Sequence, residues 1–159
     1  MTLAHKRLES SLNDNTNFTV IAELTGGPGY SFNPIVQFLG AHKDSGGSGI
    51  PAGFDFTGIT LPQNPGGVAN IIPAEVLSKL ISDDLLGELD VIPHISCKDG
   101  NTDSLTSILV GYRERDVRSL LVLTGDKPAK SLRVFELESI GLLGLVKSLN
   151  QQKYIKSSA

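Results

Sequence analysis

The chain has 159 residues and a formal net charge of -3, from 14 basic and 17 acidic side chains that form no long block of either sign. This balance argues against nucleic acid and anionic membranes as partners. The single cysteine, Cys97, has no partner for an internal disulfide, and the polar first residues lack the apolar core of a signal peptide. No apolar stretch approaches the roughly 20 residues of a membrane-spanning helix. We therefore expect a soluble, cytoplasmic protein.

The predicted elements begin with an N-terminal helix over residues 2–12, and βα units follow from about residue 17 to residue 150. Runs rich in β-branched and aromatic residues, each ending in a polar or glycine-rich turn, indicate four strands. These strands cover residues 18–24, 54–61, 89–96 and 119–124. Each of them is followed by a helical pattern.

The starts of the predicted helices carry recognisable signals. Asn33 fits an N-cap and Pro34 fits the first helical position, where its missing N–H is not needed. Pro73 marks the second helix in the same way. Asn101 and Thr102 are the capping candidates of the third helix, whose apolar residues recur at i, i+3, i+4 and i+7. The fourth helix is predicted over about residues 138–149.

Alternating strands and helices predict an α/β fold with a parallel sheet, because parallel neighbours need a long crossover between them. We interpret residues 1–159 as one domain, with about four units of an eight-unit TIM-type barrel and a polar tail over 151–159. A complete barrel needs roughly 250 residues. The glycine-rich stretch 42–53 is predicted to be a loop. Half a barrel has open strand edges, so we expect a homo-oligomer or a second chain that completes it.

Ligands of parallel α/β sheets bind at the carboxyl ends of the strands, so polar residues there are candidates for a site. Glu23 lies in an apolar run, where a carboxylate facing the core is costly unless it is paired, protonated or catalytic. Strand alternation equally allows Glu23 to face a helix and meet a lysine. By default, His94 is a hydrogen-bonded core residue. A metal site fits less well, because His94 and Cys97 are three apart in a strand and no second His/Cys pair is present.

Glycine-rich turns follow two of the strands. Residues 26–29 match neither a P-loop nor the dinucleotide motif G-x-G-x-x-G. The sequence Leu-Thr-Gly-Asp at 123–126 ends the fourth strand and, taken alone, is an ordinary turn. Neither turn predicts a nucleotide triphosphate site.

Five segments taken together are more informative than any single motif. They are Ala-Glu-Leu-Thr at 22–25, Ile-Thr at 59–60 with Asn-Pro-Gly-Gly at 64–67, Pro-His-Ile-Ser-Cys-Lys-Asp at 93–99, Leu-Val-Leu-Thr-Gly-Asp-Lys-Pro at 121–128, and Val-Phe-Glu-Leu-Glu-Ser at 134–139. In this order and spacing the chain resembles the methylenetetrahydrofolate reductase family.

The resemblance implies a βα barrel with noncovalent FAD or FMN, which takes hydride from NADH or NADPH and reduces methylenetetrahydrofolate to methyltetrahydrofolate. This places the chain in one-carbon metabolism and methionine biosynthesis, with a folate as substrate. Carried over by motif, Glu23 resembles the general acid that protonates the folate nitrogen, and Asp126 resembles the acidic residue beside the flavin pyrimidine. The flavin contacts implied by the resemblance are Thr60, His94, Leu123, Thr124, Gly125 and Asp126.

Strands five to eight of the family barrel have no counterpart after residue 150, so the expected activity is that of a fragment or of one part of a split enzyme. Two alternatives stay open. The chain is a non-catalytic flavin- or pterin-binding half-barrel module or partner subunit, or it is another pterin-using barrel such as a methyltransferase. A bound flavin would argue against the methyltransferase.

Overall fold

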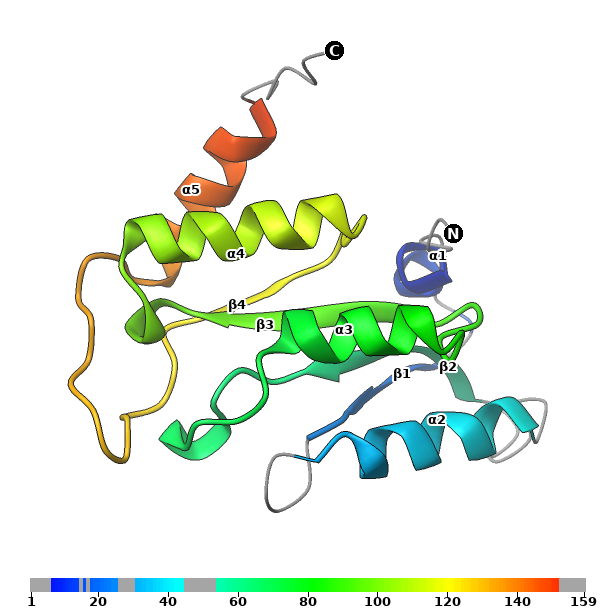
Figure 1. Ribbon diagram of the computed structural model, residues 1–159. Coiled ribbons are helices and arrows are strands. Elements are labelled where there is room, and N and C mark those ends of the chain that lie inside the picture. Colours follow the sequence, from blue (N-terminus) through cyan, green and yellow to red (C-terminus); the bar gives the residue numbers. More distant parts are fainter. Residues whose placement is uncertain (1–6, 15, 17, 26–30, 45–53, 152–159) are drawn as a thin grey trace, which may run out of the picture.

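The computed structural model describes residues 7–14, 16, 18–25, 31–44 and 54–151 of the chain. Strands and helices alternate, which confirms the predicted α/β class (Figure 1). Within the described ranges, no helix is both long and apolar enough to cross a membrane. In chain order the elements are α1 (Arg7–Asn13), β1 (Phe18–Glu23), α2 (Asn33–Asp44), β2 (Phe54–Leu61), the 3-10 helix η1 (Pro65–Gly67), α3 (Pro73–Ser82), β3 (Asp90–Ser96), the 3-10 helix η2 (Cys97–Asp99), α4 (Thr102–Glu114), β4 (Leu121–Leu123) and α5 (Ser139–Gln151).

The four strands form one all-parallel sheet in the order β1-β2-β3-β4, curled like half of a barrel. All carboxyl ends therefore meet at one edge, where the turns after β2, β3 and β4 lie together (Figure 1). At the opposite edge, α1 packs against β1 and β2 and reaches the start of β3 (Figure 1). The Leu8 N–H donates to the Asp90 carboxylate at 2.7 Å, and the Ser11 and Thr19 hydroxyls lie 2.7 Å apart.

Two apolar clusters hold the helices against one face of the sheet. The first packs α2 and α3 on the strands through fully buried side chains such as Leu39, Ile59 and Leu77. The second packs α4 and α5 on β3 and β4, with Ile95 and Leu142 at its centre. Burying one such side chain contributes about 1.5–3 kcal/mol. Residues that alternate with these along the strands face the other way, toward the inside of the curl.

The pairing of β1 with β2 contains an irregularity. Val20 pairs with Phe56 but Ile21 pairs with Gly58, so Thr57 is an extra residue on β2. Gly58 is required at the next contact, because a Cβ there would lie 2.8 Å from the Asp90 carbonyl oxygen. The absence of a side chain at Gly58 allows β2 and β3 to approach closely.

Three sequence-based expectations need correction or fall outside the described residues. The predicted loop over 42–53 is wrong at its start, because 42–44 form the last turn of α2. There the His42 ring packs edge-on against Phe56, with centroids 5.1 Å apart. The last strand is shorter than predicted, since only Leu121–Leu123 pairs with β3. Residues 2–6 of the predicted first helix, 45–53 of the predicted loop and 152–159 of the predicted tail lie outside the described ranges, and Gln151, predicted to begin the tail, is the last residue of α5.

Candidate functional site

A cleft of about 490 Å³ opens at the carboxyl ends of the strands. Its walls come from β1, β3, the end of β4 and the loop after β2, so segments far apart in the sequence meet there. Of the site residues predicted from the sequence, all but Thr60 line this cleft. The lining consists of Glu23, Pro62, Gln63, Pro65, Gly66, His94, Ser96, Leu123, Thr124, Gly125 and Asp126.

Glu23 and His94 form the ionisable pair of this cleft. The His94 side chain is 7% exposed and the Glu23 side chain 56%, with His94 Nε2 4.0 Å from Glu23 Oε2. Nε2 is buried without a hydrogen-bond partner among the described residues. Burial lowers the pKa of His94, and the negative charge of Glu23 opposes this shift only in part. The imidazole is therefore mainly neutral at neutral pH, and its Nε2 keeps an unused hydrogen-bonding capacity.

This geometry decides between the alternatives left open for the two residues. Val20, Ala22 and Leu24 face the helices, so Glu23 faces the inside of the curl and does not meet a helix lysine. His94 is not a fully hydrogen-bonded core residue, because its Nε2 has no partner in the described part of the chain. Cys97 packs in the cluster under α4 and α5, where burial raises its thiol pKa. No group of three or more His, Cys, Asp or Glu among the described residues has an arrangement that would hold a metal.

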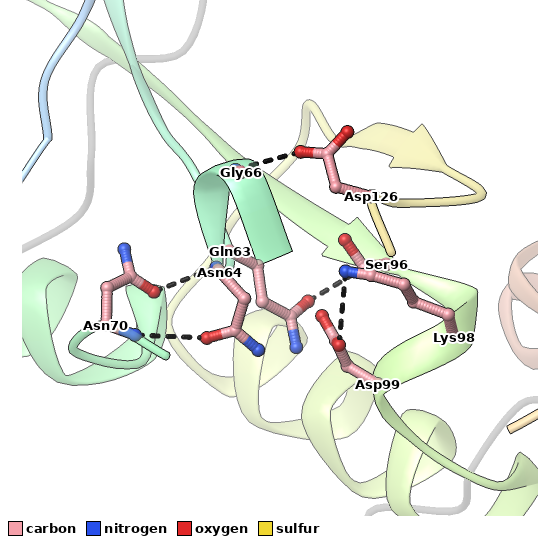
Figure 2. Close-up of polar contacts among 8 residues, drawn as sticks. All are labelled: Gln63, Asn64, Gly66, Asn70, Ser96, Lys98, Asp99 and Asp126. Atoms are coloured by element: carbon pink, nitrogen blue, oxygen red, sulfur yellow. Dashed lines mark hydrogen bonds and ion pairs between the residues drawn. The ribbon is translucent and has the colours of Figure 1, made fainter. Parts of the chain in front are cut away.

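The turn after β4 contributes Asp126 to the cleft. Gly125 adopts φ +91°, a conformation that L side chains rarely take. The Lys98 N–H donates to the Thr124 carbonyl at 3.2 Å, which fixes the start of the turn. Asp126 Oδ2 accepts a hydrogen bond from the Gly66 N–H at 2.9 Å (Figure 2). The carboxylate thus ties the β4 turn to the loop after β2.

The loop after β2 is held by its own polar groups. The Asn64 side chain accepts a hydrogen bond from the Asn70 N–H at 3.1 Å, and the Asn70 side chain accepts one from the Asn64 N–H at 2.8 Å (Figure 2). Asn64, Gly66 and Gly67 all have positive φ values. The Gly67 carbonyl accepts from the Ala129 N–H at 2.9 Å, so this loop and the segment after β4 are joined at two points.

Sequence reasoning missed Gln63 and Ser96 as parts of the site. Gln63 Oε1 accepts from the Ser96 N–H at 2.9 Å and bridges the ends of β2 and β3 (Figure 2). The available signal was an amide side chain two residues after a predicted strand. Thr60 was expected at the site and pairs with Glu23 in the strand register, but it does not line the cleft.

Comparison of the chain with protein-family models, with curated proteins and with solved structures found no match.

Proposed function

We propose that the chain is a flavin-dependent reductase of the methylenetetrahydrofolate reductase type, or one part of such an enzyme, and that the cleft at the carboxyl ends of its strands is the site. In this proposal the four strands are part of a TIM-type barrel. A bound FAD or FMN would supply the hydride transfer from NADH or NADPH to the methylene carbon of the folate. The observation that carries the proposal is that Glu23, His94 and Asp126, drawn from three different strand ends, line one cleft.

The residues present fit a flavin. The cleft volume of about 490 Å³ lies within the usual range of ligand sites. His94 Nε2 is a buried polar atom without a partner in the described residues, and the ring that carries it lines this cleft. Gly125 has no side chain to fill the floor beside Thr124. The ring system would be held by His94, Leu123, Thr124, Gly125 and Asp126. Thr60, which does not line the cleft, would support the site from β2.

Glu23 is suited to donate a proton to the folate. Reduction of the methylene carbon breaks its bond to one folate nitrogen, and that nitrogen must gain a proton. Glu23 supplies it as general acid. Since the Glu23 side chain is 56% exposed, solvent can return the proton after each turnover.

Asp126 is suited to orient ligands at the edge of the cleft. Its hydrogen bond from the Gly66 N–H holds one carboxylate oxygen, which leaves the other to accept from a ring N–H of flavin or pterin. Its charge also opposes the accumulation of negative charge on a bound ligand.

The test of this proposal is Glu23→Gln, measured separately in the two half-reactions. Reduction of flavin by nicotinamide should be nearly unchanged, whereas folate reduction should fall about 10²- to 10⁴-fold, the usual contribution of a general acid. Glu114→Gln, an exposed position in the last turn of α4, is the matched control and should alter neither reaction. Equal loss in both half-reactions would show that Glu23 is not the acid.

The non-catalytic binding module is the second candidate. The exposure of Glu23 favours this candidate. A closed active site would shield the carboxylate from bulk water, and no described residue does so here. A wild-type chain that binds flavin and folate but supports neither half-reaction would establish this alternative.

A further inference from the structure

A buried lysine lies directly behind the floor of the cleft. Lys98 is in η2, immediately after β3, and its side chain is only 3% exposed. Its backbone is fixed on both sides, since its N–H donates to the Thr124 carbonyl and its carbonyl accepts from the Val134 N–H. The position of the side chain is therefore set by the same contacts that shape the β4 turn.

The ammonium group is only loosely neutralised. Lys98 Nζ lies 3.4 Å from Asp99 Oδ1, and the two side chains point toward each other (Figure 2). Among the described residues, neither Nζ nor Asp99 Oδ2 has a hydrogen-bond partner. A buried charge whose hydrogen-bonding capacity is unused is costly, so a further negative or electron-rich group nearby would stabilise the ammonium.

The Lys98 side chain packs directly against Gly125, which forms part of the cleft floor. A Cβ on Gly125 would lie 3.0 Å from both Cγ and Cε of Lys98, and 3.0 Å from Ser96 Cβ. Gly125 and Ser96 both line the cleft. Because Cε carries the ammonium, the positive charge lies behind Gly125 and Ser96 and acts on whatever rests on these two residues.

We propose that Lys98 sets the charge preference of the cleft, so that its floor favours a ligand group that gains negative charge. This inference rests on the proposed function and extends it: Lys98 makes the site bind reduced flavin more tightly, relative to oxidised flavin, than it otherwise would. Lys98 touches neither the ligand nor the reacting atoms and acts as a positioning charge behind the floor. Asp99, as its partner, moderates the effect.

The test compares the dissociation constants of oxidised and reduced FMN for the whole chain under anaerobic conditions. Lys98→Met removes the charge and keeps the length of the side chain, and it should lower the preference for reduced FMN about tenfold. Asp99→Asn should change the preference in the opposite direction, and Lys98→Arg should retain it. Lys79→Met removes a lysine on α3 whose side chain is 42% exposed and should have no effect.

Opposite shifts in the two neighbouring variants separate an electrostatic role from structural damage, which would weaken both redox states in both variants. If Lys98→Met does not fold, Asp99→Asn still decides the question, because a role of Lys98 in packing alone predicts no change in the redox preference of that variant. If the wild type binds FMN, and if Lys98→Met and Asp99→Asn show the same preference for reduced FMN as the wild type, the inference about Lys98 is overturned but the proposed function is not. Absence of FMN binding by the wild type overturns the proposed function and this inference with it.

Discussion

Replacing Gly67 by alanine should disrupt the joint between the loop after β2 and the segment after β4. Gly67 has φ +75°, and a Cβ at this position would clash with the Lys127 carbonyl oxygen. No rotamer change relieves this contact, because the opposing atom belongs to the backbone. Gly66→Ala is a matched control one residue away, with φ +64° and no atom within 4 Å of the added Cβ.

The expected magnitudes follow from this difference. Both variants place an alanine in the left-handed region, which costs about 1–2 kcal/mol. Gly67→Ala must also separate the two segments, and this breaks the hydrogen bond from Ala129 to Gly67 and the one from Gly66 to Asp126. At about 1 kcal/mol for each bond, the total loss is about 3–4 kcal/mol, against about 1–2 kcal/mol for Gly66→Ala.

Urea denaturation of both variants and the wild type measures these losses as free energies of unfolding, and amide hydrogen exchange at Ala129 reports the joint directly. Gly67→Ala should increase exchange at Ala129, whereas Gly66→Ala should leave it protected. Equal loss of stability in the two variants, with Ala129 equally protected, would refute the view that these segments close against each other over the cleft.

Three further changes have defined outcomes. Leu77→Ala, at a fully buried position of α3, should lower the free energy of unfolding by about 2–5 kcal/mol in urea denaturation. Asp126→Asn should raise the midpoint potential of bound flavin, because removing a negative charge favours the reduced form; an unchanged or lower potential would place Asp126 away from the ring. Hydrogen bonds from the backbone and then the side chain of Thr102 lower the pKa of Glu136 below 4.5, so this carboxylate stabilises the fold above about pH 4.5 and ceases to do so as pH falls through its lowered pKa. In Glu136→Gln the urea midpoint of unfolding should therefore fall less steeply below about pH 4.5 than in the wild type. The same pH dependence in both proteins would contradict this role of Glu136.

The helix starts could be read from the sequence because they depend on local chemistry. Pro73 begins α3, and the Asn101 side chain accepts from the Ser104 N–H as a cap should. The start of α2 is displaced by one residue, because Asn33, predicted as the N-cap, is the first residue of the helix. The end of β4 was misplaced because strand length depends on the neighbour, and only Leu121–Leu123 finds partners on β3.

The sequence indicated which strand ends form the candidate site, but it did not indicate on which face of the sheet the side chains lie. Alternation along β1 places Glu23 opposite Val20 and Ala22, yet it does not say which face meets the helices. No sequence signal indicates that Lys98 is buried, because a lysine after a strand normally lies in solvent. Its burial depends on a glycine at position 125, which belongs to a different βα unit.

The most direct test of the proposed function is a titration of the chain with FAD and FMN, followed in the visible spectrum. We expect a weak but saturable change that corresponds to one flavin per chain, with an affinity reduced about tenfold in His94→Ala, as expected for the loss of one hydrogen bond in a buried site. A spectrum that stays that of free flavin at every protein concentration would contradict the assignment of this cleft to a flavin.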